Sequence, residues 1–417
     1  FVLEDPLVFS DGTKVKTRED WSRRREEILE IFQSQMYGRM PGDPEAVVIE
    51  TIEEGKTMSG SGNRKQVRMW FRKDKSGPSV NWLIITPSNA QGPVPTVIML
   101  NYQGNHTVLP DPEIVITDAW MRSTNDKAER EKNRGSLTNP SSRTRIPADL
   151  LVARGYALVT ACYAELSPDP DPGQKGPDGR LLQDEFAYTG LFSLWGPRDP
   201  KRTDNTTALA CWAWALRRGM DLIERDPGLD QKRVILTGSS RLGKAALIAG
   251  AFDERFPVVV PNQTGGGGVP LAKRNFGETI TTEMNSFTHW YCKAYGRYAG
   301  HEDIMPFDQH LLLTCVAPRP LLIEGFDQLS TMATTYNFPY YPQHMERMGF
   351  EKDADWIELK LFVPEGGQVP DKHRRISEMI MKRYNLSIKK YSSAKKIKED
   401  YGQAIFDLMN EAYAPLY

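Results

Sequence analysis

The residues of greatest chemical interest are a serine and two cations that lie within seven positions. The segment reads Gly238-Ser239-Ser240-Arg241-Leu242-Gly243-Lys244. An apolar run, Val234–Thr237, precedes it, and a helical pattern, Lys244–Ala251, follows it. A serine on a tight turn between a strand and a helix exposes its hydroxyl above the sheet, where the hydroxyl can attack an ester. We therefore predict that Ser240 is a catalytic nucleophile.

The residues around Ser240 fit this chemistry, with one departure from the common motif. Gly238, two positions before the serine, lets the backbone bend sharply. The backbone N–H of Arg241 is expected to point to where an oxyanion forms during acyl transfer. The common motif has glycine two positions after the serine, whereas this chain has Leu242 there and Gly243 one position later. The alternative interpretation is that Ser240 only caps a buried helix.

Strands and helices alternate along the chain on either side of this segment. Short apolar runs bounded by turn residues predict strands at Val47–Ile52, Val67–Phe71, Val80–Thr86, Thr96–Leu100, Ala157–Cys162, Val234–Thr237, Val258–Pro261, Leu321–Glu324 and Trp356–Val363. A first helix is predicted to begin after Thr17, and its apolar stripe ends at Gly38 and Pro41. Further helices are predicted at Leu150–Ala153, Thr207–Arg225, Lys244–Ala251 and Asp371–Arg383. This alternation predicts a three-layer α/β sandwich with a mostly parallel central sheet.

Composition limits the remaining possibilities. The chain has 417 residues and a net charge of -1, so no overall field attracts nucleic acid, and no apolar run is long enough to span a membrane. The four cysteines form no C-x-x-C pair, so we expect free buried thiols and no zinc site. The start, Phe1-Val2-Leu3-Glu4, does not look like a signal peptide, and the alternative is a mature terminus whose signal has been removed. We expect one domain over residues 1–417, with an N-terminal helical extension and an exposed Pro- and Asp-rich loop at Ser167–Gly179.

The segment around Ser240 also carries a family resemblance. Its pattern G-x-S-R-x-G-K resembles the nucleophile motif of the glucuronoyl esterases, and nearly the whole chain is similar to the bacterial branch of that family. The stretches that resemble it include Gln35-Met36-Tyr37-Gly38, Asn101-Tyr102-Gln103-Gly104-Asn105-His106, Trp212-Ala213-Trp214, Arg274-Asn275-Phe276-Gly277-Glu278-Thr279, Phe307-Asp308-Gln309-His310 and Ala317-Pro318-Arg319-Pro320.

The resemblance implies an α/β-hydrolase that cleaves esters of uronic acid carboxyl groups, such as glucuronate that links xylan to lignin. It implies no metal and no cofactor, and a periplasmic or secreted location. The side chain of Arg241 would help to stabilise the oxyanion, and Lys244 and Glu278 would hydrogen-bond hydroxyls of the uronate. Lys244 lies in the first turn of a helix, where the macrodipole favours anions, and this mismatch indicates a functional lysine. The alternative is an ordinary solvated lysine.

The pattern departs from the family at the general base. The family has a histidine in a Gly-Gly-His turn after the last strand, but this chain has Gly366-Gly367-Gln368. An amide cannot take the serine proton, so the usual serine–histidine relay lacks its base there. His373 or His310 could serve instead, or the catalytic apparatus could be degraded. The other histidines give no comparable indication: His106, His289, His301 and His344.

The acid of the relay is displaced as well. Gln263 stands where many relatives have a glutamate. Other bacterial relatives carry the acid after a later strand, where this chain has Glu324 and Asp327, and Asp327 is the better placed. A tryptophan that often packs on the sugar is absent from residues 328–333.

These observations predict a serine esterase that acts on uronic acid esters of plant or algal polysaccharides through an acyl-enzyme. A pectin methylesterase acting on galacturonate would need the same groups. A non-catalytic carbohydrate-binding homologue that has lost its base is the rival from another class. The sequence does not specify the oligomeric state.

Overall fold

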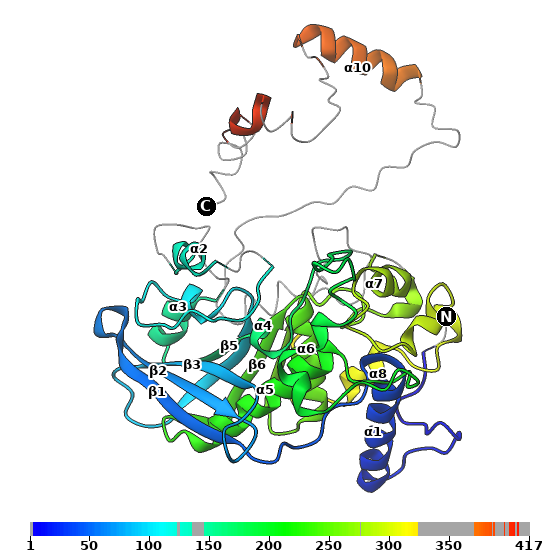
Figure 1. Cartoon of the computed structure of the whole chain (residues 1–417). Helices are drawn as coiled ribbons and strands as arrows, with labels where there is room; N and C mark the ends of the chain where they lie inside the picture. Colours follow the sequence, from blue (N-terminus) through cyan, green and yellow to red (C-terminus); the bar gives the residue numbers. More distant parts are fainter. Residues whose placement is uncertain are drawn as a thin grey trace. The chain divides into compact units, whose positions relative to one another are not determined.

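One mixed β-sheet forms the centre of the first of the two units of the chain. The computed structural model describes residues 3–122, 126–135, 146–275, 277–323, 371–385, 387, 396, 400–404 and 407. The two units are Phe1–Tyr336 and Asn337–Tyr417. Within the described residues, the sheet has seven strands in the order β1-β2-β3-β5-β4-β6-β7 (Figure 1).

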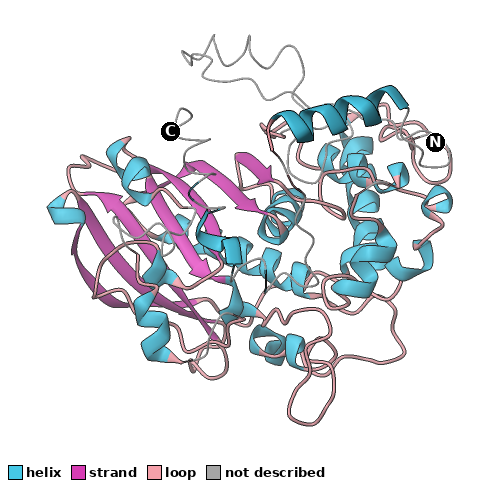
Figure 2. Cartoon of the chain, turned by 90° about the horizontal axis from the view of Figure 1, so that it is seen from above, coloured by secondary structure: helices cyan, strands magenta, loops and turns pink. Residues whose placement is uncertain are grey.

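The strands divide the sheet into an antiparallel part and a parallel part. Their bounds are β1 Val48–Thr57, β2 Gly62–Trp70, β3 Ser79–Pro87, β4 Val94–Asn101, β5 Ala157–Cys162, β6 Leu229–Ser239 and β7 Val258–Asn262. Strands β1, β2, β3 and β5 pair antiparallel, whereas β5, β4, β6 and β7 pair parallel. Figure 2 shows how the strands fan out across the twisted sheet. Parallel strands place their carboxyl ends at one edge, where α/β enzymes bind ligands.

Helices cover both faces of this sheet. In the first unit they are α1 Arg18–Phe32, α2 Lys127–Lys132, α3 Ala148–Ala153, α4 Tyr163–Leu166, α5 Ala208–Arg225, α6 Arg241–Phe252, α7 Ile280–Ser286 and α8 Gln309–Thr314, and the second unit contains α10 Asp371–Arg383. Helices α5 and α6 pack against each other and against β4 and β6, whereas α3 packs against β3 and β5.

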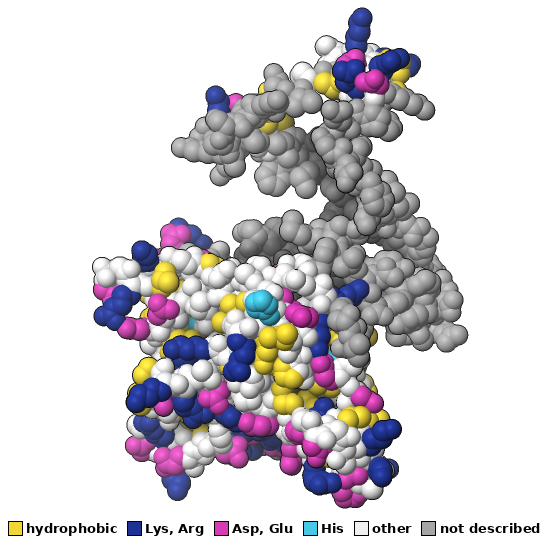
Figure 3. Space-filling model, turned by 90° about the vertical axis from the view of Figure 1, so that its right-hand side faces the viewer, with side chains coloured by type: hydrophobic (Ala, Val, Ile, Leu, Met, Phe, Trp, Pro, Cys, Tyr) yellow, Lys and Arg dark blue, Asp and Glu magenta, His cyan; other side chains and the backbone are white. Residues whose placement is uncertain are grey.

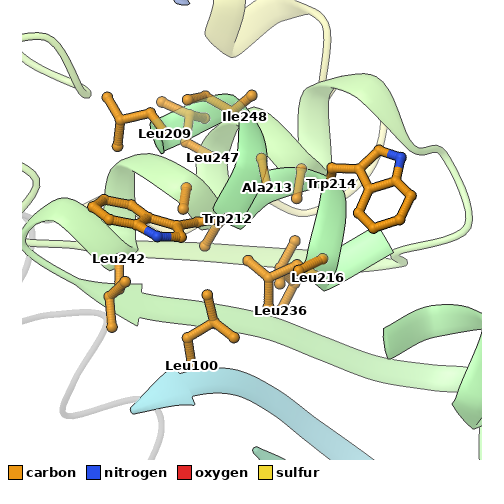
Figure 4. Close-up of a cluster of buried hydrophobic side chains, with 14 of the residues drawn as sticks. Leu100, Leu209, Trp212, Ala213, Trp214, Leu216, Leu236, Leu242, Leu247 and Ile248 are labelled. Carbon is orange, nitrogen blue, oxygen red and sulfur yellow. The ribbon is translucent and has the colours of Figure 1, made fainter. Parts of the chain in front are cut away.

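The period-two pattern of the strands builds a separate hydrophobic core on each face. On β3, Trp82 and Ile84 belong to the larger core, and the alternate residues Leu83 and Ile85 belong to the smaller core under α3. The larger core contains the apolar stripe of α5 together with α6, as Figure 4 shows for Trp212, Leu216, Leu247 and their neighbours. Strands β4 and β6 contribute Ile98, Leu100, Val234 and Leu236 to the larger core, and these are the strands that lead into the predicted site.

The predicted three-layer α/β-hydrolase fold is confirmed, although strand ends differ by several residues. Strand β6 begins five residues before the predicted Val234, and α6 begins three residues before the predicted Lys244. Leu321 forms an isolated parallel bridge with Val259, while Glu324 and the predicted strand Trp356–Val363 lie outside the described residues. The predicted N-terminal helix and the predicted helix Asp371–Arg383 are present. The single-domain organisation stays a prediction.

One loop prediction is wrong in part. Residues 167–170, at the start of the stretch expected to be exposed, are all buried. The local composition is typical of a surface loop, but Ser167 donates a hydrogen bond to the Ala187 carbonyl oxygen, and Asp169 accepts several hydrogen bonds from residues distant in sequence. Tertiary partners therefore overrode the local pattern.

The cysteines and the surface follow the expectations from composition. All four cysteines are buried and free. No helix among the described residues has the length and apolar character that a membrane span requires. On the face drawn in Figure 3, basic and acidic side chains are interspersed, in keeping with a net charge of -1.

His106 lies in the loop after β4, and its side chain is buried together with the loop. The residue is 1% exposed. Burial, helped by the positive charge of Arg134, lowers the pKa of His106 to about 4. The imidazole is therefore neutral in the folded chain at neutral pH.

We predict that His106 makes the fold sensitive to mild acid. The unfolded chain takes up this proton near pH 6.5, whereas the folded chain takes it up only near pH 4. The contribution of His106 is therefore fully present above pH 6.5 and is lost as the pH falls toward 4, by roughly 2 to 3 kcal/mol at pH 4.5. Urea unfolding at pH 7 and pH 4.5 should show a smaller difference for His106→Gln than for the wild type. His301→Gln, the same change at an exposed histidine, should leave the difference unchanged, and equal differences in all three proteins would contradict the prediction.

Candidate active site

Ser240 occupies a sharp turn between β6 and α6. Its backbone has φ 56° and ψ −131°, a conformation that residues other than glycine rarely adopt, and the residue is exposed. The hydroxyl makes no capping hydrogen bond to the helix. The helix-capping interpretation is therefore wrong, and the geometry is that of a nucleophile elbow.

Two glycines allow the backbone to pass closely around this turn. A Cβ on Gly238 would lie 2.3 Å from the carbonyl oxygen of Leu242. A Cβ on Gly243 would lie 2.6 Å from the carbonyl oxygen of Asn262, which also accepts a hydrogen bond from the Ser240 N–H at 3.1 Å. This explains the departure from the common motif, because the close approach to β7 occurs at Gly243, while Leu242 is buried in the core.

The region expected to hold an oxyanion lies at the N-terminus of α6. The N–H groups in the first turn of a helix have no intrahelical acceptor, and the helix dipole favours negative charge there. The loop after β4 is fastened to this region, since the Tyr102 hydroxyl donates to the Ser239 carbonyl oxygen at 2.5 Å. The elbow and this neighbouring loop are thus held in one arrangement.

The Arg241 side chain is anchored by a buried carboxylate. Its guanidinium is hydrogen-bonded and ion-paired to Asp169, whose side chain is fully buried. The guanidinium also faces the Trp290 ring at 4.8 Å and lies near the rings of Tyr102 and Phe287. Only 18% of the Arg241 side chain is exposed, so the cation beside the nucleophile is fixed in position.

Asp169 accepts hydrogen bonds from several other elements. His289 Nε2 lies 2.8 Å away, Trp290 Nε1 2.9 Å, the Tyr163 hydroxyl 3.1 Å and Arg122 3.0 Å. Burial alone would raise the pKa of Asp169, but the hydrogen bond from His289 and the charge of Arg241 hold that pKa well below its usual range. Burial lowers the pKa of His289, which leaves this imidazole neutral at neutral pH, with Nε2–H donating to Asp169.

Lys244 is buried and ion-paired, so the interpretation as an ordinary solvated lysine is wrong. The residue is 2% exposed, and Nζ lies 3.1 Å from Glu283 Oε1, whose side chain is equally buried. Nζ also lies 4.8 Å from the centre of the Trp290 ring. Trp290 thus stands between the Lys244–Glu283 pair and the Arg241–Asp169 pair.

Glu278 lies close to this pair and is exposed. Its Oε2 accepts a hydrogen bond from the Gly266 N–H at 2.9 Å, and a Cβ on Gly266 would lie 2.2 Å from the Glu278 carbonyl oxygen. The glycine-rich turn therefore closes tightly around Glu278. Burial raises the pKa of Glu283, and the nearby charge of Glu278 adds to this increase. The structure thus brings the predicted residues Ser240, Arg241, Lys244 and Glu278 into one neighbourhood.

A cavity of about 190 Å³ opens beside Arg241. Its lining includes Tyr102, Trp120, Arg122 and Tyr163. A cavity lined by aromatic rings and cations, with Arg241 next to the exposed Ser240 in its wall, suits a polar ring-shaped ligand with a carboxyl-derived group. Within the described residues, no group of His, Cys, Asp or Glu side chains is arranged to hold a metal ion.

Comparisons with known proteins agree with this geometry. The family model for "Glucuronyl esterase, fungi" matches residues 191–339. Carbohydrate esterase MZ0003, from an unknown prokaryotic organism, is 36% identical over 331 residues, which cover 78% of this chain and 73% of that protein. A 4-O-methyl-glucuronoyl methylesterase of Schizophyllum commune is 27% identical over 77% of this chain and 66% of its own length. The chain belongs to the glucuronoyl esterase family.

A solved structure supports the same assignment. The glucuronoyl esterase from Solibacter usitatus superimposes with a TM-score of 0.65 at 32% identity and covers 77% of this chain and 78% of its own. The family resemblance read from the motifs is therefore confirmed. The chain spans just under two thirds of the Schizophyllum commune relative, so that protein's activity does not by itself extend to this chain.

The base and acid expected for a member of this family are not located by the structure. Asp327 and Gln368 lie outside the described residues, and His373 lies in α10, where its side chain is not described. Among the described residues, no histidine is hydrogen-bonded to Ser240. His310 Nε2 bonds to the Glu4 carbonyl oxygen at 2.7 Å, a structural contact away from Ser240.

Three residues of the site, Asp169, His289 and Trp290, could not be recognised from the sequence. Asp169 lies in a Pro-Asp-Pro run that is typical of a surface loop, and His289 and Trp290 follow no recognisable motif. Asp169 comes seven residues after the end of β5, at the carboxyl edge of the parallel strands. Its position relative to that edge was the only local indication.

We predict that removing one partner of the buried Lys244–Glu283 pair strongly lowers the free energy of unfolding. Lys244→Met leaves an unpaired buried carboxylate, which should lower the free energy of unfolding by about 3–5 kcal/mol, whereas Lys244→Met with Glu283→Leu should recover much of the loss. The exposed pair Lys132–Glu129 is the matched control, and Lys132→Met should cost less than about 1 kcal/mol. Urea unfolding provides the comparison, and similar losses for the two single variants would contradict the prediction.

Proposed function

We propose that the chain is a serine carboxylic-ester hydrolase that cleaves uronic acid esters of plant or algal polysaccharides. The observation that carries the proposal is the exposed Ser240 at a strained strand–helix turn, with Arg241 fixed beside it. Membership of the glucuronoyl esterase family supports the same substrate class. A methyl-esterified galacturonate needs the same groups and is a related substrate to be tested.

The proposed reaction proceeds through an acyl-enzyme. Ser240 Oγ attacks the carbonyl carbon of the uronate ester, and a general base takes the hydroxyl proton. The Arg241 side chain and the N–H groups in the first turn of α6 stabilise the negative oxygen of the tetrahedral intermediate. The C–O bond to the alcohol then breaks, the alcohol leaves with a proton, and water hydrolyses the acyl-enzyme by the reverse sequence.

Glu278 and Lys244 are proposed to serve the sugar part of the substrate. The exposed Glu278 carboxylate can accept a hydrogen bond from a uronate hydroxyl, because the Gly266 N–H fixes its orientation. Lys244 is almost fully buried beside Glu283. We therefore assign it two roles, holding the floor of the site and donating to a hydroxyl that reaches it.

His373 is proposed as the base and Asp327 as the acid that orients it. This assignment follows from the absence of a histidine at Gln368 and from the retention of Ser240, Arg241, Lys244 and Glu278. A periplasmic or secreted location, which the family resemblance implies, stays a prediction.

We predict that Ser240→Ala abolishes hydrolysis of methyl glucuronate and leaves the melting temperature nearly unchanged, because the exposed hydroxyl makes no capping hydrogen bond to the helix. Initial rates and thermal unfolding measure the two effects. The neighbouring Ser239→Ala is the matched variant, since it keeps the backbone carbonyl that binds Tyr102, and it should retain most activity. If Ser240→Ala also retains most activity, another group is the nucleophile.

We predict that His373→Ala lowers kcat on methyl glucuronate by about 10²–10⁴, the usual contribution of a positioned general base. Gln368→His should then give little gain, because the base is already supplied. His301→Ala, at an exposed histidine, should match the wild type. A large gain from Gln368→His, together with no loss from His373→Ala, would show that the wild-type chain lacks a base and would favour the non-catalytic, carbohydrate-binding function.

A further inference from the structure

We propose that Asp169 is a positioning residue that holds the Arg241 guanidinium beside Ser240. The inference rests on the proposed function, because it concerns the same site. Asp169 belongs to the segment after β5, whereas Arg241 begins α6, 72 residues later. Their ion pair is therefore a tertiary contact that fixes the side chain next to the nucleophile.

The surroundings of Asp169 are unusual for a residue with only a stabilising role. Its carboxylate is fully buried and is contacted by two guanidinium groups, an imidazole, an indole N–H and a phenol. Removing a charge from water is costly, and buried ion pairs rarely stabilise a fold more than apolar side chains of the same volume would. A buried ionic cluster beside the nucleophile is therefore better explained by a need to hold the Arg241 guanidinium in one orientation.

The contacts of the Arg241 guanidinium hold it against Asp169 and Trp290 and leave a small part of the side chain exposed. One terminal nitrogen of the guanidinium binds Asp169, and the Trp290 ring lies against the group at 4.8 Å. The Nε atom is buried and has no hydrogen-bond partner within the described structure. The 18% of the Arg241 side chain that stays exposed is the part that can face a negative oxygen formed at the substrate beside Ser240.

The neighbours of Asp169 hold the carboxylate itself in place. His289, Trp290 and Tyr163 each donate one hydrogen bond to it, and they come from two segments that lie far apart in the sequence. Arg122 supplies a second cation and also pairs with the exposed Asp171. Because the carboxylate cannot move, it can fix the guanidinium that it binds, and a displacement of about 1 Å in such a group can cost a hundredfold in rate.

The test is a double-mutant cycle with methyl glucuronate as substrate. Asp169→Asn keeps the size of the side chain but removes its charge, and it should lower kcat by on the order of ten- to a hundredfold with a change in KM of less than about threefold. Arg241→Ala should lower kcat by about a hundredfold. In the Arg241→Ala background, Asp169→Asn should lower kcat by less than about twofold, since there is no guanidinium left to position.

Asp221→Asn is the matched control, because Asp221 is also a buried carboxylate between two arginines, Arg218 at 3.0 Å and Arg255 at 2.8 Å. It makes no contact with the site among the interactions of the described residues, so it should lower the melting temperature and leave kcat unchanged. A merely structural role for Asp169 predicts the same behaviour as this control, or equal losses of kcat with and without Arg241, and either result would overturn the inference.

If Asp169→Asn does not fold, Asp169→Glu keeps the negative charge but shifts it by one methylene group. A large loss of kcat with a preserved melting temperature would support the inference, and an unchanged kcat would overturn it. A folded wild-type chain without esterase activity would overturn the proposed function and this inference together. Wild-type activity with an unaffected Asp169→Asn variant would overturn the inference alone.

Discussion

The reversal of the main chain at Ser240 is the constraint on which the rest of the site depends. A parallel strand must become a helix at one residue, and Ser240 accepts a positive φ to do so. Such backbone strain costs on the order of 1–3 kcal/mol and persists only where the surroundings enforce it. Here the absence of side chains at Gly238 and Gly243 lets the turn press against its neighbours, and the Asn262 carbonyl oxygen holds the Ser240 N–H. The strain is thus balanced by the packing of β6, β7 and α6.

Around this turn, buried charges are arranged so that each one has a partner from another part of the chain. Asp169 joins Arg241 to Arg122 and His289, and Lys244 pairs with Glu283. Trp290 lies between the two groups, with its indole N–H on Asp169 and its ring facing both cations. In a low-dielectric environment such pairs are strongly directional, so they fix the positions of functional side chains more effectively than apolar contacts could.

The fold explains why these groups meet where they do. The carboxyl ends of parallel strands lie at one edge of the sheet, and the segments that follow β4, β5 and β6 contribute Tyr102, Asp169 and Ser240. The hydrophobic cores anchor these strands in the sheet, while the segments beyond the strands supply the polar groups. The same separation of scaffold and loops is used by many α/β enzymes, and the relatives of this chain are carbohydrate and glucuronoyl esterases built on the same fold.

The sequence by itself determined the elements, the elbow and the family, because these depend on local periodicity and on residues close together in the chain. The run from Val234 to Lys244 contains the strand, the turn and the start of the helix, and a short window is sufficient to recognise them. Only the tertiary structure decided which charged side chains are buried and which groups they pair with. The sequence indicates a functional Lys244 but not its burial, and it places Asp169 in a typical surface loop, yet both are buried with partners such as Glu283 and His289, 39 and 120 residues away. Pairing across such separations depends on how the elements pack, and a local pattern in one sequence carries no record of it.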